Sequence, residues 1–207
     1  MFMNIRSRFI EYLVLANALM FIVSIAAPAT VIRYLAVTPA HVFEMPWTLI
    51  TNMFIHADLT HIFFNMFFGV IMFGGYLEGI IGEKEFIKTY FIGGVTAALF
   101  YVFFSLVFWI PHPLTPAVGA SGAVFAAIGA LVVLRPNMKI YLYFFFPMPL
   151  YVFAGLYTLY GLFAIPTSMG GDVAVTAHLG GLLAGLVMGY MMEKRYETPS
   201  YTVIRYY

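Results

Sequence analysis

The stretch Gly119-Ala120-Ser121-Gly122 places a serine hydroxyl between two glycines, at the start of an apolar segment that runs without a charged residue to Leu134. We expect this segment to be a helix that lies in a membrane. The glycines leave space beside Ser121, and the first turn of a helix presents unpaired backbone N–H groups and the positive end of the helix dipole. An attacking serine needs such surroundings, because its tetrahedral intermediate carries a negatively charged oxygen. By itself the serine is a weak signal, since serine hydroxyls in apolar helices commonly bond back to helix carbonyls.

The composition is that of a membrane protein. Of the 207 residues, 63% are hydrophobic and 9% are charged, against roughly 25% charged residues in a soluble domain. A helix needs about 20 apolar residues to cross the hydrocarbon core of a bilayer. Six such stretches, named spans 1 to 6, lie near residues 9–27, 59–77, 86–110, 117–134, 140–165 and 173–192. The chain is therefore predicted to be an all-α polytopic membrane protein, a six-helix transmembrane bundle with one domain over residues 1–207 and a short tail at 193–207.

The distribution of Lys and Arg predicts the orientation, because short cytoplasmic loops collect these residues. If the N-terminus is cytoplasmic, nine of the ten basic residues fall on the cytoplasmic side and only Arg33 falls outside. An even number of spans returns the C-terminus to the same side. We therefore predict an integral protein of the cell membrane with both termini in the cytoplasm, and the net charge of +1 gives no sign of nucleic-acid binding. A cleaved signal peptide over the first apolar stretch is the alternative for the N-terminus.

Spans 2, 4 and 6 all run from the outside inward, and each carries unusual polar residues in its first turns. These are His61 and Asn65 in span 2, Ser121 in span 4 and His178 in span 6. A polar group that faces lipid costs several kcal/mol, so such side chains usually face the bundle interior or a water-filled cavity. The four side chains are therefore predicted to share one depth, just below the outer surface. A purely structural role as helix cross-links stays open for His61 and Asn65.

His178 is the only histidine in spans 3 to 6 and is the candidate base for Ser121. Contact between the two requires that spans 4 and 6 approach closely. Small residues on one helix face permit such an approach, and both spans have them: Gly122, Ala126 and Gly129 in span 4, and Gly181, Gly185 and Gly189 in span 6. We therefore predict that spans 4 and 6 pack in close contact and that Ser121 and His178 can hydrogen-bond.

Two segments depart from the regular spans. Residues 28–58 mix three prolines with apolar side chains, and we expect this segment at the outer interface with Trp47 at headgroup depth. Span 5 carries Pro147 and Pro149, which predicts a kink or a local opening of its helix.

Three ordered motifs make the sequence resemble the rhomboid family of intramembrane serine proteases across all six spans. They are His56-x4-His61-x3-Asn65 at the start of span 2, Gly119-Ala120-Ser121-Gly122 at the start of span 4, and Ala177-His178-x2-Gly181-x3-Gly185 in span 6. The resemblance implies a rhomboid-type bundle and a serine endopeptidase that cuts membrane-spanning protein substrates near the outer face of the lipid bilayer. It implies no cofactor and no metal, and the sequence does not predict an oligomeric state.

The resemblance also implies roles for individual residues. Ser121 would be the nucleophile and His178 the general base and then acid. The oxyanion hole would be formed by His61, Asn65 and the backbone N–H of Ser121. Supporting positions around the site would be His56, Gly119, Gly122 and Phe125. The segment after span 1 would be a membrane-embedded first loop, and span 5 with the loop 167–175 would be a mobile gate and cap, with Phe64 on the facing side.

Two positions depart from the family pattern. Many members have Tyr four residues after the serine, where this chain has Phe125, which can still stack on the catalytic histidine but lacks the hydroxyl. The first loop has Trp47-Thr48 where a Trp-Arg pair is common, so the arginine of that pair is replaced by threonine here.

Three other functions compete with this interpretation. A non-catalytic binder of transmembrane helices would use the same fold without chemistry. A metalloprotease would use His56, His61 and His178, although the first two are five residues apart and no H-E-x-x-H motif is present. A small-solute transporter would also carry polar residues in its spans, but no inverted repeat is visible.

Overall fold

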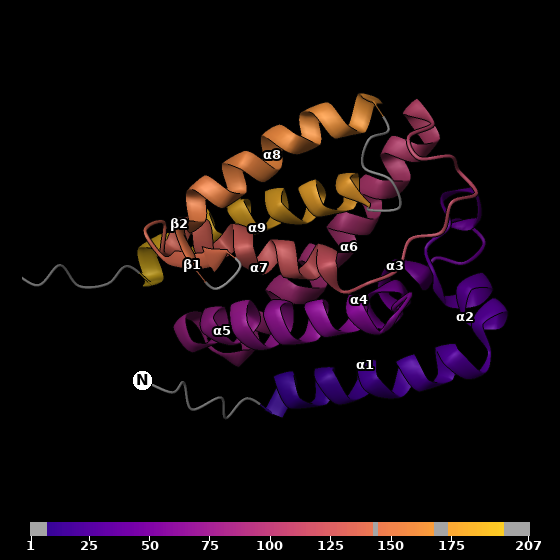
Figure 1. Cartoon of the computed structure of the whole chain (residues 1–207), viewed down its shortest axis with the longest axis horizontal. Coiled ribbons are helices and arrows are strands. Elements are labelled where there is room, and N and C mark those ends of the chain that lie inside the picture. Colours follow the sequence, from indigo (N-terminus) through magenta and orange to yellow (C-terminus); the bar gives the residue numbers. More distant parts are fainter. Residues whose placement is uncertain (1–7, 143–144, 168–173, 197–207) are drawn as a thin grey trace, which may run out of the picture.

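Long apolar helices lie side by side in the computed structural model, which describes residues 8–142, 145–167 and 174–196 (Figure 1). The N-terminal half contains α1 (Arg8–Ala26), α2 (Pro28–Leu35), the 3₁₀ turn η1 (Pro39–His41), α3 (Thr48–Thr51), the 3₁₀ turn η2 (Asn52–Phe54), α4 (Leu59–Phe63), the π-helical stretch η3 (Phe64–Gly74) and α5 (Gly75–Ile81). The C-terminal half contains α6 (Glu83–Phe108), α7 (Ser121–Leu134), β1 (Lys139–Leu142), β2 (Phe146–Pro149), α8 (Leu150–Thr167) and α9 (Val175–Tyr196).

Four helical segments among the described residues are long and apolar enough to cross a membrane. They are Arg8–Ala26, Leu59–Ile81, Glu83–Phe108 and Val175–Glu193, which confirms a helical membrane fold and matches spans 1, 2, 3 and 6. The helices in spans 4 and 5 are shorter, at Ser121–Leu134 and Leu150–Ile165. With a rise of about 1.5 Å per residue, α7 is roughly 21 Å long, less than the roughly 30 Å of a bilayer core. Six crossings therefore stay a prediction.

The helix α7 begins at Ser121, which confirms the predicted helix start at the glycine-flanked serine, although the predicted apolar stretch begins near residue 117. Ala117 is instead paired with Val37 by two backbone hydrogen bonds of 2.9 and 3.1 Å. Gly119 then has a φ of +120°, which a helix cannot contain. The pairing with a residue 80 positions earlier holds Ala117 in an extended bridge, the chain turns at Gly119 and Ala120, and Ser121 is the first residue of the helix.

The predicted start of span 5 at residue 140 is wrong. Residues 139–142 and 146–149 form an antiparallel pair of strands in which Lys139 lies opposite Pro149 and Leu142 opposite Phe146. Proline lacks a backbone N–H, and it disfavours helical geometry at the residue before it. Pro147 and Pro149 lie in β2, immediately before α8, so neither proline is inside the helix in which they were predicted to cause a kink.

The helix α7 lies between α5 and α9 in the middle of the bundle (Figure 1). Its alanines are buried almost completely, with Ala123, Ala126 and Ala130 at 0% exposure. The glycine stripe of α9 faces α7 directly, because a Cβ atom added at Gly181 would collide with the Gly122 carbonyl oxygen, and one added at Gly185 would collide with that of Ala126. The predicted close contact of spans 4 and 6 is confirmed.

The two ends of the bundle carry different features. The helices α4, α7 and α9 all begin at the end where α2 and α3 lie, whereas β1 and β2 lie at the opposite end (Figure 1). Arg33 belongs to α2. The opposite end of the bundle holds the helix ends that carry most other basic residues, namely the starts of α1 and α6 and the ends of α7 and α9. The first turns of three helices thus meet at one depth, where the candidate site is found.

Candidate active site

Ser121 and His178 are joined by a hydrogen bond between Oγ and Nε2 of 2.6 Å. Ser121 is the first residue of α7 and His178 lies in the first turn of α9, so the close packing of these two helices brings the side chains together. Both residues are partly exposed. A hydroxyl within hydrogen-bond reach of an imidazole nitrogen is the geometry of a nucleophile and its base.

Phe125, one turn after the serine on α7, packs flat against the histidine. The ring centroids of Phe125 and His178 are 4.5 Å apart and the planes differ by 12°. The aromatic contact on the histidine face is therefore present although the tyrosine hydroxyl of the family pattern is not. The stacking restricts rotation of the imidazole about its own axis.

Tyr157 from α8 contacts the other nitrogen of the same imidazole, with its hydroxyl 2.6 Å from Nδ1 of His178. Its ring also lies 4.5 Å from that of Phe125. A continuous series of hydrogen bonds thus runs from Ser121 through His178 to Tyr157. Sequence reasoning missed Tyr157, because nothing local distinguishes it among the 15 tyrosines of the chain.

His61 and Ser121 lie on the same side of Gly119. A Cβ atom added at Gly119 would be 2.7 Å from Nε2 of His61 and 3.7 Å from Oγ of Ser121. The Nδ1 atom of His61 accepts a long hydrogen bond of 3.4 Å from the backbone N–H of Ala57. Because one nitrogen accepts, the proton of the neutral ring is on Nε2, which makes this atom a donor beside the serine.

Asn65 is buried in η3, one turn after His61. Its Nδ2 atom donates to the His61 carbonyl at 2.9 Å. Its Oδ1 atom is buried and has no hydrogen-bond partner among the described residues. The amide therefore has unused hydrogen-bonding capacity on the helix that also carries His61.

His56 lies beneath His61, in the turn before α4. It is 2% exposed, and its ring packs edge-on against that of His61 at a centroid distance of 5.0 Å. Neither ring nitrogen makes a hydrogen bond of good geometry within the described residues, and the Phe54 carbonyl and the Asp58 carboxylate favour the protonated ring only weakly. Burial first, and the nearby His61 second, lower the pKa of His56 to about 3. The ring is neutral at physiological pH.

Asn52 is a second residue that sequence reasoning did not identify. Its backbone carbonyl accepts a hydrogen bond of 2.9 Å from the N–H of Gly119, and its side chain donates to the Thr48 carbonyl at 2.6 Å. Thr48, which stands where an arginine is common in the family, is buried and donates its hydroxyl to the Met45 carbonyl at 2.7 Å. These bonds tie the strand-like segment before the serine to α3 and η2.

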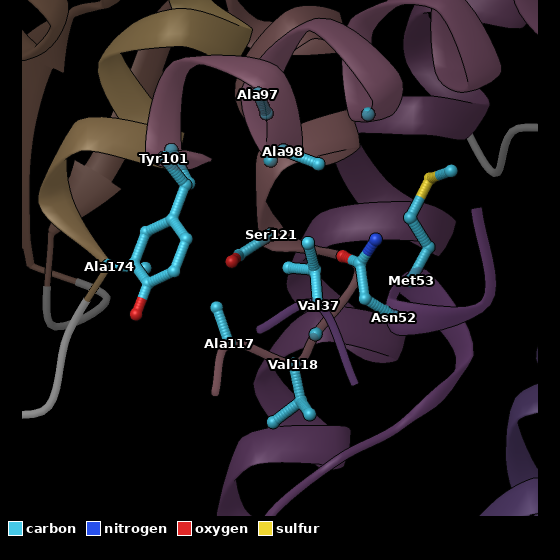
Figure 2. Close-up of a pocket in the computed structure, with 14 residues that line it drawn as sticks. Val37, Asn52, Met53, Ala97, Ala98, Tyr101, Ala117, Val118, Ser121 and Ala174 are labelled. Atoms are coloured by element: carbon cyan, nitrogen blue, oxygen red, sulfur yellow. The ribbon is translucent and has the colours of Figure 1, made fainter. Parts of the chain in front are cut away.

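A small cavity of about 20 Å³ lies next to the serine. Figure 2 shows the Ser121 side chain between Tyr101 on one side and Asn52 and Met53 on the other, with Val37 and Ala117 beside it. A site needs roughly 10–15 Å³ and polar partners to hold a water molecule. The cavity has room for one water beside the serine hydroxyl.

The predicted gate lies partly outside the described residues. Phe64 is 56% exposed and stacks on Phe68 at 5.3 Å, so it belongs to an apolar surface of α4 and η3. Residues 168–173, most of the predicted cap 167–175, lie outside the described part of the chain. The gate and cap stay predictions. Across residues 8–142, 145–167 and 174–196, no three His, Cys, Asp or Glu side chains gather in the way that a metal ion requires.

Comparison with known proteins identifies the relatives of this chain. Residues 44–195 match the Rhomboid domain family. The chain is 31% identical to RHOMBOID-like protein 12, mitochondrial, of Arabidopsis thaliana over 71% of its own length and 46% of that protein. It is 29% identical to Rhomboid-like protease 3 of Toxoplasma gondii, over 78% and 57%, and 28% identical to Rhomboid protease GlpG of Haemophilus influenzae, over 72% and 70%. The match thus spans about half the length of the first two relatives.

Proposed function

Because this chain belongs to the rhomboid family, we propose that it is an intramembrane serine protease that cleaves membrane-spanning proteins near one face of the bilayer. Two of the relatives described above carry the word protease in their names. The single observation that carries the proposal for this chain is the 2.6 Å hydrogen bond between Ser121 Oγ and His178 Nε2. It supports a pair of residues that can move a proton during attack on a peptide bond.

In the proposed reaction, Oγ of Ser121 attacks the carbonyl carbon of the scissile bond while Nε2 of His178 accepts the hydroxyl proton. The tetrahedral intermediate collapses when the C–N bond breaks and His178 returns the proton to the leaving amine. The acyl group is then held as an ester on Ser121. A water molecule, deprotonated by the same nitrogen, attacks the ester and releases the acid and the free serine. The cavity beside Ser121 supports this step, because it has room for one water.

The oxyanion of the tetrahedral intermediate needs donors beside the serine. The backbone N–H of Ser121 is at the helix start, where it has no partner within the helix. The Nε2–H of His61 lies beside Gly119, and we propose that Asn65 contributes an amide hydrogen from the same helix. His56, which packs on His61 as a neutral ring, would keep the His61 ring in place. Gly119 and Gly122 would leave room for the substrate carbonyl.

The substrate is proposed to be a transmembrane helix. Carbonyls within a membrane-spanning helix are hydrogen-bonded, so a serine cannot attack them without local unwinding. We therefore expect cleavage at a helix-destabilised stretch of small residues. From the distribution of basic residues we also propose that the site lies near the outer face of a single six-span domain whose termini are cytoplasmic. We propose the cell membrane as its location, although one relative is mitochondrial by name.

The test is cleavage of a model transmembrane substrate by the purified protein in proteoliposomes. Ser121→Ala and His178→Ala should each abolish cleavage, and a fluorophosphonate should label the wild type at Ser121. Wild-type activity in either variant would overturn the assignment of nucleophile and base. A protein that binds transmembrane helices but is neither active nor labelled would instead be the non-catalytic binder, and loss of activity on chelation would favour the metalloprotease.

A further inference from the structure

The tautomer of His178 decides whether it can act as a base. In a neutral imidazole one nitrogen carries the proton and the other accepts, and the partner of each nitrogen determines which is which. To accept the proton of Ser121, Nε2 must be unprotonated, so Nδ1 must carry hydrogen. A group that accepts a hydrogen bond from Nδ1 would hold the ring in this form, as a carboxylate does in many hydrolases.

The structure offers one side chain for this task. The Tyr157 oxygen is 2.6 Å from Nδ1, and no carboxylate hydrogen-bonds to His178 in the part of the chain that the structure describes. A phenolic oxygen can accept as well as donate. When Nδ1–H donates to it, Nε2 is left free to accept from the serine.

Packing holds the Tyr157 ring in place. Ala154 and Gly161, about one turn before and after it on α8, are buried, whereas Leu156, Leu159 and other residues of the opposite face are about half exposed. Tyr157 is therefore on the face of α8 that meets α9. Phe125 lies between the two polar rings, with centroids 4.5 Å from each. The three rings pack as a group, which restricts movement of the hydroxyl away from Nδ1.

We infer that Tyr157 is the positioning residue of the base: its oxygen accepts from Nδ1–H, selects the tautomer in which Nε2 receives the serine proton, and stabilises the imidazolium that then forms. This inference rests on the proposed function of Ser121 and His178. The chain lacks a tyrosine hydroxyl at position 125, and α8 supplies one to the same imidazole from a different direction. Because Tyr157 belongs to α8, the base is correctly oriented only while α8 is seated against α9.

The variant Tyr157→Phe removes one oxygen and keeps the ring. A hydrogen bond between neutral groups stabilises the imidazolium less than a bond to a buried carboxylate would, so we expect kcat to fall only roughly 3- to 10-fold. KM should be unchanged, because the substrate is bound equally well. Tyr160→Phe is the matched control, since it removes a hydroxyl from the next turn of the same helix, on a residue 46% exposed. Its kcat should equal that of the wild type.

Nitrogen-15 NMR of the histidine ring measures which ring nitrogen carries the proton. This tautomer would not change if Tyr157 only supported the fold. In the wild type the His178 signals, assigned by their loss in His178→Ala, should show a protonated Nδ1 and an unprotonated Nε2. In Tyr157→Phe they should shift toward a mixture of tautomers, and in Tyr160→Phe they should not. An unchanged tautomer, an unchanged kcat or an effect on KM alone would each overturn the inference. Failure of the proposed function can be told apart from failure of this inference. If the proposed function is wrong, fluorophosphonate will not label the wild type at Ser121, but NMR will still show the tautomer of His178.

Discussion

The substitution Gly119→Ala tests whether the backbone beside the serine is shaped for the reaction. Gly119 has a φ of +120°, a conformation that residues with a side chain rarely adopt. The Cβ of an alanine would be 2.7 Å from Nε2 of His61. One methyl group would thus strain the backbone just before α7 and crowd His61, the proposed oxyanion donor.

The expected magnitude has two parts. Holding a non-glycine residue at this φ costs about 1–3 kcal/mol. The methyl group must also move about 0.7 Å away from His61 to reach ordinary van der Waals contact, or the N–H of Gly119 must leave the Asn52 carbonyl that it bonds at 2.9 Å. A displacement on the order of 1 Å in catalytic geometry reduces the rate by about 100-fold. We therefore expect kcat to fall by roughly 30- to 100-fold, with a loss of stability of about 1–3 kcal/mol.

The assay compares cleavage of a transmembrane substrate in proteoliposomes, labelling by fluorophosphonate, and thermal unfolding in detergent. Gly79→Ala is the control, because a Cβ there meets nothing within 4 Å and the residue is within α5; its activity should match the wild type and its stability should be equal or slightly higher. A folded Gly119→Ala protein with kcat within about 3-fold of the wild type would refute the reasoning, because the space beside Gly119 would then not matter.

Three further predictions concern neighbours of the serine. Asn65→Ala should reduce kcat about 100-fold if the amide binds the oxyanion. The control is Asn17→Ala, which removes an amide that donates in the same way to the carbonyl four residues earlier in α1 and should leave cleavage unchanged. Equal effects of the two substitutions would remove Asn65 from the oxyanion hole. Phe125→Ala should reduce kcat roughly 2- to 10-fold through loss of the stacked ring and Phe125→Tyr should not, and wild-type kinetics in the alanine variant would contradict this. The pKa of His56 is lowered to about 3 from a value near 6.5 in the unfolded chain, so the unfolded state binds the proton first and stability falls as the pH drops from 6.5 toward 3. Between pH 7 and 5 the wild type should therefore lose about 2 kcal/mol more than His56→Gln, as measured by unfolding at each pH, and parallel curves would refute the assignment.

Much of the fold was predictable because a bilayer imposes a simple rule on sequence. Apolar length predicts where α1, α6 and α9 lie, since every backbone group in lipid must be bonded within its own helix. The glycine stripes of α7 and α9 also predicted their close contact, because small residues permit it directly. The common position of the starts of α4, α7 and α9 follows from alternation of direction along the chain.

Other features depend on contacts that no local pattern records. Whether residues 139–142 and 146–149 form a helix or paired strands depends on two opposed preferences. Their apolar character favours a span, whereas Pro147 and Pro149 disfavour a continuous helix. The start of α7 depends on the pairing of Ala117 with Val37, 80 positions away. Neither partner carries a motif.

The sequence by itself determined the membrane environment, the long apolar helices and the common depth of Ser121, His61, Asn65 and His178. These features follow from hydropathy, charge and the order of elements. Only the tertiary structure decided which groups face the histidine. The rotation and tilt of each helix, set by packing against its neighbours, bring Oγ of Ser121 to one nitrogen of His178 and the Tyr157 hydroxyl to the other. A shift of one residue along α8 would turn that hydroxyl by about 100° away from the site, and hydropathy would not register the difference.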